Sequence, residues 1–170
     1  MSMVGMVQAV DDAEIVRLKF NADMLTEQLA AASAGLPPQR AGFPVPPLDL
    51  EKSWHAVHFL LTASLEGSGS ILDFLVDGGE EIGDDTGYGP PRAFRADEVA
   101  QIARAMGAID IPDLQSRFQP AEMNTIGIYP MVWDEPADEL FEWLSDSFAR
   151  LRAYLLDAAA NGRGILVAIM

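Results

Sequence analysis

The residues best suited to chemistry are two histidines in the segment that follows Asp49. Glu51, His55, His58 and Thr62 are spaced at i, i+4, i+7 and i+11, which predicts one polar helix face. Imidazole and carboxylate groups bind first-row metals, and imidazole acts as a general base near neutral pH. The histidine spacing of the zincin motif is absent, and no cysteine is available, so we predict no metal site. Catalysis, ligand binding and structural hydrogen bonding remain as interpretations of His55 and His58.

A second candidate is the segment 87–92, which reads G-Y-G-P-P-R. Glycines on both sides of Tyr88 permit close approach of the backbone to a ligand, and the guanidinium of Arg92 suits a carboxylate or phosphate. The segment is not a dinucleotide-binding motif, because the third glycine is missing. The alternative is a proline-stiffened loop in which Arg92 pairs with a nearby acid. The nearby acids are Glu80, Glu81, Asp84 and Asp85.

A third candidate consists of Tyr129 and Trp133, which flank Pro130. Aromatic side chains on loops line pockets, and they also pack over the edge of a core, so both interpretations stay open. No P-loop, kinase or serine-hydrolase motif occurs, and no cofactor is expected. The predicted ligand-binding residues are Trp54, His58, Tyr88, Arg92, Tyr129 and Trp133.

The elements that position these residues follow from the hydrophobic pattern. Apolar residues at three- and four-residue steps predict helices, and short apolar runs bounded by turn residues predict strands. Expected helices begin after Asp11, Asn21 and Asp49 and span 97–106 and 139–160, with a short apolar turn at 71–76 and a further turn of helix at 112–118. Expected strands span 3–10, 92–95 and 165–170, and any strand at 126–133 lies at an edge because of Pro130.

The order of these elements predicts an α+β domain. Apolar strands at both ends with helices between them indicate a small mixed or antiparallel sheet that includes both terminal strands and is covered by several helices. The elements do not alternate regularly, so a doubly wound sheet is not expected. The segment 35–47, with five prolines, is expected to be a loop. A length of 170 residues fits a single domain, 1–170.

The charge of the chain restricts its partners. A formal net charge of -15 repels phosphate backbones and anionic lipids, so neither nucleic acid nor a membrane is expected as a partner. The same charge permits a basic protein partner, or a cationic or metal-bound ligand, and it is also explained by solubility alone. The chain has no cysteine, no stretch long enough to span a membrane and no secretory signal, so we expect a cytoplasmic protein.

Several segments together resemble the YfbM-like family of small bacterial proteins. They are D-L-E-K-S-W-H-A-V-H-F-L-L-T at 49–62, Gly78-Gly79, Ile82-Gly83, Tyr88-Gly89-Pro90 with Arg92, Ile128-Tyr129-Pro130 with Trp133, and the start S-M-V-G-M at 2–6. The chain departs from the family pattern at Ser2, where glycine is usual, and in its proline-rich segment 36–47. The resemblance implies an α+β fold and a bacterial origin, and it implies no established activity.

Three functions follow as hypotheses. The first is a binding module for a small polar ligand or a protein partner, of which an immunity protein against a basic toxin is one version. The second is an enzyme with His55 or His58 as general base and Arg92 holding an anionic substrate. The third is a structural or oligomerisation domain, and the chain is expected to be a monomer or a homodimer.

Overall fold

The computed structural model describes residues 2–37 and 42–170. In this part of the chain, five antiparallel strands form one sheet in the order β2-β1-β5-β4-β3, with seven α-helices and one 3-10 helix around it. The strands are β1 (Gly5–Val10), β2 (Leu48–Glu51), β3 (Glu80–Glu81), β4 (Arg92–Phe94) and β5 (Gly164–Ile169). The helices are α1 (Asp12–Lys19), α2 (Ala22–Ser33), α3 (Trp54–Thr62), η1 (Ile71–Leu75), α4 (Ala96–Gly107), α5 (Ile111–Arg117), α6 (Pro120–Ile126) and α7 (Ala137–Ala160).

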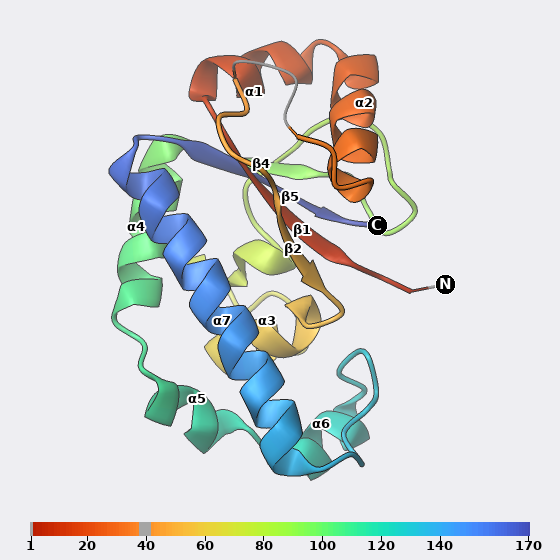
Figure 1. The fold of residues 1–170 in the computed structure, drawn as a ribbon, viewed down its shortest axis with the longest axis vertical. Coiled ribbons are helices and arrows are strands. Elements are labelled where there is room, and N and C mark those ends of the chain that lie inside the picture. Colours follow the sequence, from red (N-terminus) through yellow and green to blue (C-terminus); the bar gives the residue numbers. More distant parts are fainter. Residues whose placement is uncertain (1, 38–41) are drawn as a thin grey trace.

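The two terminal strands form the middle of the sheet. β1 and β5 pair along their whole length, from Gly5 opposite Ile169 to Val10 opposite Gly164. Beyond the strands, Val4 and Met170 exchange both backbone hydrogen bonds, so the two ends of the chain lie side by side, as Figure 1 shows. The predicted α+β class with both terminal strands in the sheet is confirmed, and the sheet is antiparallel.

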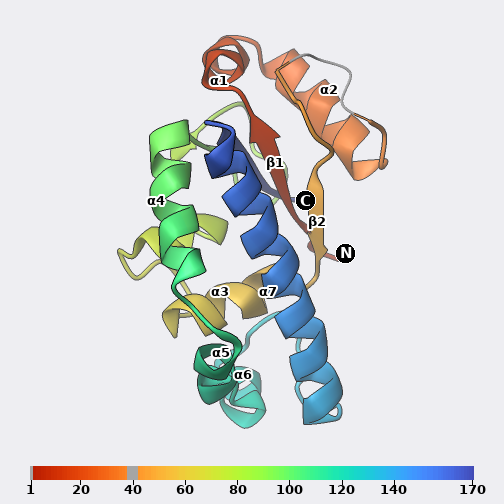
Figure 2. The same cartoon turned by 60° about the vertical axis from the view of Figure 1, so that its left-hand side comes forward.

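Each face of the central strands has its own core, because successive side chains of a strand point to opposite faces. Val7 of β1 and Val167 of β5 belong to the core under α3, α4 and α7. Met6 of β1 and Leu166 of β5 belong to the core under α1 and α2. Figure 2 shows α1 and α2 separated from α4 and α7 by the sheet.

The helix α7 confirms the most regular pattern in the sequence. Its buried side chains recur at three- and four-residue steps and face the main core. Asn161 and Gly162 follow its last turn, and Gly162 has the left-handed φ of +64° that such a stop requires. The buried residues of this stripe include Leu140, Leu144, Phe148, Leu151 and Leu155. None of the helices in the described residues is long and apolar enough to cross a membrane.

The helix expected to begin after Asp49 begins later. Residues Leu48–Glu51 form β2, which pairs with β1, and α3 begins at Trp54. The Asp49 carboxylate accepts the N–H of Glu51 rather than capping a helix, and Glu51 has a positive φ of 50°. The predicted polar face of four residues was therefore wrong at its first member, because Glu51 does not share the helix of His55.

The segment 126–133 contains no strand: α6, which the pattern did not predict, ends at Ile126, and Gly127 terminates it with a φ of +82°. The described parts of the expected loop at 35–47, namely 35–37 and 42–47, contain neither helix nor strand, and 38–41 lie outside the described residues. The expected helices at 97–106 and 139–160 and the strand at 92–95 are present with small shifts of their ends.

Candidate functional site

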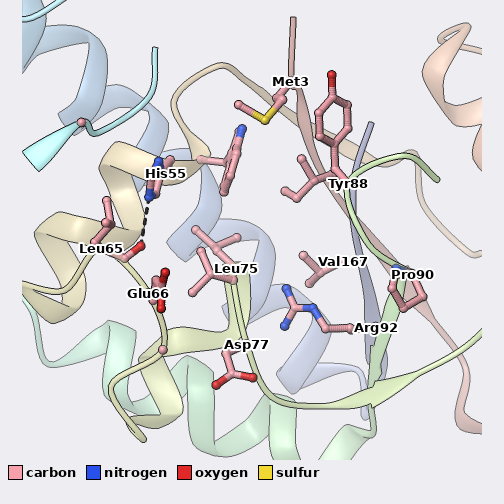
Figure 3. A pocket seen from close by; sticks show the side chains of 15 residues that line it. Met3, His55, Leu65, Glu66, Leu75, Asp77, Tyr88, Pro90, Arg92 and Val167 are labelled. Carbon is pink, nitrogen blue, oxygen red and sulfur yellow. Dashed lines mark hydrogen bonds between the residues drawn. The ribbon is translucent and has the colours of Figure 1, made fainter. Parts of the chain in front are cut away.

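Residues from two of the predicted segments, 49–62 and 87–92, meet at one pocket of about 750 Å³. Trp54 and His55 come from the start of α3, Tyr88 from the loop before β4, and Arg92 from β4 itself. Val167 and Ile169 of β5 also line the pocket, and Val167 lies opposite Arg92 in the sheet. Figure 3 shows the guanidinium of Arg92 pointing from β4 toward Leu75 and Asp77, with Tyr88 on another side of the same space.

The imidazole of His55 is held at both nitrogens by backbone groups. Its Nε2 donates to the carbonyl of Leu65 at 3.0 Å, which is the dashed line in Figure 3. Its Nδ1 accepts the N–H of Tyr129 at 3.1 Å. Burial lowers the pKa of His55, although the bond to Leu65 opposes this shift. A neutral ring with its only lone pair engaged has no free base for a substrate, so this geometry favours a structural role.

His58 is fully buried. Its Nε2 donates to the carbonyl of Glu66 at 3.1 Å, whereas its Nδ1 is buried without a partner among the described residues. Burial is the main cause that lowers the pKa of His58, so the ring is neutral near pH 7. His58 does not line the pocket. It supports the loop that carries Glu66.

The loop after α3 is also held by Asp73, which is buried. Its carboxylate accepts the N–H of Ser68 at 2.7 Å, the hydroxyl of Ser68 at 2.9 Å and the N–H of Ser70 at 2.8 Å. Burial raises the pKa of Asp73, but these hydrogen bonds outweigh it and leave the pKa below its ordinary value. The ionised side chain of Asp73 therefore holds the loop that forms one wall of the pocket.

Arg92 is the cation of the pocket, and it is half-buried. Its Nη1 donates to the carbonyl of Gly78 at 3.1 Å, and its Cζ lies 5.7 Å from the centre of the Phe94 ring. Burial lowers the pKa of the guanidinium, and the charges of Asp77 and Glu81 partly oppose this. Among the described residues no carboxylate oxygen lies within 4.0 Å of its nitrogens, so the alternative of a local ion pair is not realised.

Two carboxylates, Glu66 and Asp77, line the same pocket and were not predicted. Asp77 accepts the N–H of Gly78 at 2.7 Å through Oδ1, while its Oδ2 lies against Gly67, where any Cβ would collide with it. The sequence feature that could have indicated Asp77 is its position directly before the Gly78-Gly79 pair. Within the described residues, no group of three histidine, aspartate or glutamate side chains is arranged to hold a metal ion.

The predicted aromatic residues divide into two groups. Trp54 lines the pocket and stacks on His55 at 5.0 Å between ring centres. The ring of Tyr129 contacts Trp54 with ring centres 6.2 Å apart, but Tyr129 does not line the pocket. The hydroxyl of Tyr129 accepts the N–H of Met3 at 3.1 Å, so it fixes the start of the chain at the rim. Trp133 is different: it is buried in the main core, where its Nε1 donates to the carbonyl of Ile128 at 2.6 Å, and it does not line the pocket.

Comparison with known proteins identifies the family and the fold. The model of a domain of unknown function, DUF1877, matches residues 1–168. The crystal structure of a protein of unknown function, YfbM from Escherichia coli, superposes with a TM-score of 0.75. The alignment has 21% identity and covers 98% of this chain and 99% of that chain, and at this identity it establishes a shared fold. A search of curated proteins gave no match. The resemblance noted from the sequence is confirmed, and the chain belongs to the DUF1877 family.

Proposed function

We propose that this protein is a binding module whose pocket between α3 and β4 takes a small polar molecule through an anionic group. The observation that carries the proposal is the state of Arg92: its guanidinium is half-buried in a pocket of about 750 Å³ and contacts no carboxylate among the described residues. A guanidinium has five N–H donors, and the hydrogen bond to Gly78 uses one nitrogen of the fork. The remaining donors suit a carboxylate or phosphate.

The state of the histidines favours binding over catalysis. A general base needs a lone pair within hydrogen-bond reach of the substrate. The lone pair of His55 is engaged by Tyr129, and the free Nδ1 of His58 is buried on a side chain that does not line the pocket. Besides His55 and Tyr88, the charged side chains of Arg92, Glu66 and Asp77 line the pocket, and they suit the recognition of a charged ligand.

The test is a thermal-shift screen with small carboxylic acids, phosphates and amino acids on the unmodified protein, Arg92→Gln and Arg104→Gln. Arg104 is exposed on α4 and has no hydrogen bond or ion pair to a described residue, so it controls for the loss of one positive charge. We expect a ligand whose affinity falls about ten- to a hundredfold in Arg92→Gln, the size of a lost charge-assisted hydrogen bond, and is unchanged in Arg104→Gln. Equal binding to both variants would refute the role of Arg92.

A second groove favours a second candidate, the docking of a basic segment of a protein partner. This groove, of about 630 Å³, lies where the N-terminal part of α7 meets the end of β2. Trp143 and Leu140 provide apolar surface, and Glu51, Glu135 and Glu139 provide negative charge against the single cation Lys52. Such a lining suits a lysine or arginine side chain beside an apolar one, since a cation also binds over an aromatic face.

This candidate is tested with the peptide (Arg-Leu)3 and its charge-reversed control (Glu-Leu)3, followed by tryptophan fluorescence. Trp54 and Trp133 are buried, so a change in emission on peptide binding to the groove comes mainly from Trp143. Only the basic peptide should change the emission, and Glu139→Gln should weaken its effect. Equal responses to both peptides would count against recognition by charge.

A further inference from the structure

We infer that the ligand of the Arg92 pocket is a small zwitterion, a carboxylic acid that also carries an ammonium group. The inference rests on the proposed function and extends it by naming the chemical class. Its basis is that the pocket holds two carboxylates, Glu66 and Asp77, in addition to its one guanidinium. In Figure 3 the guanidinium of Arg92 points toward the side on which Asp77 lies, and Glu66 follows Leu65 on the facing loop.

The position of Asp77 is fixed by its surroundings. Its Oδ1 accepts the N–H of Gly78, and its Oδ2 occupies space that is open only because residue 67 has no side chain. Neither Asp77 nor Glu66 has an ion pair with a described residue. Both carboxylates therefore keep lone pairs for a donor from solution, and an ammonium group supplies three such donors.

The charges of the pocket select against simple ions. A ligand with only an anionic group would gain at Arg92 but would be repelled by Glu66, by Asp77 and by the net charge of -15. A ligand with only a cationic group would gain at Glu66 and Asp77 but would be repelled by Arg92 and would leave its guanidinium without an anionic partner. A zwitterion places each of its charges against the opposite charge of the protein, which is the arrangement that electrostatic complementarity favours.

The remaining lining points to an apolar body between the two charges. Trp54, Leu75 and Val167 contribute aromatic and aliphatic surface, and Ile169 and Met3 extend it toward the chain ends. A pocket with apolar walls and a few placed polar groups is typical of a small-molecule site. The chemistry on both sides therefore fits a free amino acid with an aliphatic or aromatic side chain.

The experiment compares whole zwitterions with their halves. The twenty standard L-amino acids are screened by thermal shift at millimolar concentration. For leucine and phenylalanine, the acids without the amino group (4-methylpentanoate and 3-phenylpropanoate) and the amines without the carboxylate (3-methylbutylamine and 2-phenylethylamine) are tested by calorimetry. We expect at least one apolar amino acid to bind, and both of its halves to bind at least about tenfold more weakly.

Variants separate the two charges. Asp77→Asn keeps an oxygen that accepts the Gly78 N–H, so the variant should fold. Its affinity for the amino acid should fall about tenfold, whereas its affinity for the acid without the amino group should be unchanged or higher. Asp23→Asn, exposed on α2, is the control for the loss of one negative charge. Arg92→Gln should lower the affinity for both the amino acid and the acid without the amino group.

The outcomes distinguish the inference of a zwitterionic ligand from the proposed anion site at Arg92. If an acid without the amino group binds as tightly as its amino acid and Asp77→Asn has no effect, the inference of a zwitterionic ligand is overturned and the anion site at Arg92 stands. If an amine binds as tightly as its amino acid, the anion site fails as well. If no amino acid binds while another anion from the broader screen does, the inference is again overturned and the proposed function is not.

Discussion

The backbone N–H of Tyr129 donates a hydrogen bond to Nδ1 of His55 at 3.1 Å, which ties α3 to the loop after α6. Nε2 of the same ring donates to the carbonyl of Leu65 at 3.0 Å. The substitution His55→Ala leaves both backbone groups without these partners. Because an unpaired, partly buried group costs about 1–3 kcal/mol, we expect the free energy of unfolding to fall by about that amount in urea titrations.

A matched substitution at a neighbouring position controls for the loss of a polar side chain. Lys52 is exposed just before α3 and has no hydrogen bond to a described residue, so Lys52→Ala should change the free energy of unfolding by less than about 0.5 kcal/mol. A urea midpoint for His55→Ala equal to that of the unmodified protein would show that the imidazole does not hold the two loops.

The two histidines also predict how stability depends on pH. Burial lowers the pKa of both His55 and His58 in the folded protein. As the pH falls below about 6.5, the unfolded chain therefore binds more protons than the folded protein, which favours unfolding. This contribution to stability is complete above about pH 6.5 and is lost toward the lower folded-state pKa, with a slope of up to about 1.4 kcal/mol per pH unit for each imidazole.

Two measurements check this prediction. The chain has two histidines, so the imidazole Cε1–H signals are two resonances, and each should titrate with a midpoint below about 6.5 in NMR spectra. Urea titrations between about pH 7 and pH 5 should show the loss of stability, and His58→Gln should reduce its slope. A midpoint at or above 6.5 for either ring would contradict the burial argument.

The elements that the sequence predicted well are those whose pattern is complete within the element. The apolar stripe of α7 and the Asn161-Gly162 stop need no partner to be recognised, and the predicted start at Glu139 lies two residues after the observed start at Ala137. The strand β2 differs. Its four residues carry a weak signal, and they are extended because they pair with β1, a contact that is distant in the sequence.

The same distinction applies to the site. Tyr88 and Arg92 were predicted because they share one segment of unusual composition. Asp77 could not be singled out among 26 acidic residues, since its approach to Arg92 depends on how the loop after η1 packs against β4. Trp133 was assigned to the site although aromatic residues on loops occur both in pockets and in cores. Only the packing of this loop, which places Trp133 in the main core, distinguishes the two cases.

A third prediction concerns Gly5, which lies where the pairing of β1 with β2 changes register. A Cβ at this position would lie 2.5 Å from Cβ and 2.8 Å from Cγ of Trp54. Because the indole or the strand would have to move, we expect Gly5→Ala to lower the free energy of unfolding by about 1–3 kcal/mol in urea titrations.

The control for Gly5→Ala is the same substitution in a helix. A Cβ on Gly107, the last residue of α4, would meet only Leu156 at an ordinary contact distance of 4.0 Å. Because alanine is a better helix former than glycine, Gly107→Ala should leave stability unchanged or raise it by up to about 1 kcal/mol. Equal effects of the two substitutions would mean that Gly5 is not constrained by Trp54.

The last prediction separates two residues that the sequence assigned to one site. Trp133 is 3% exposed and its indole N–H is bonded to Ile128, whereas Tyr88 is 39% exposed and lines the pocket. Trp133→Phe should therefore lower the free energy of unfolding by about 1–3 kcal/mol, because the carbonyl of Ile128 loses its buried donor. The folded variant should bind the pocket ligand with unchanged affinity in calorimetry.

Tyr88→Ala should behave in the opposite way. An exposed side chain contributes little to folding, so the free energy of unfolding should stay within about 0.5 kcal/mol of the unmodified protein. Affinity for the pocket ligand should fall, since the ring forms one side of the space that Arg92 enters. If Trp133→Phe weakened binding and Tyr88→Ala did not, the ligand would have to lie near Ile128 in the loop after α6, and the pocket at Arg92 would lose its support as the site.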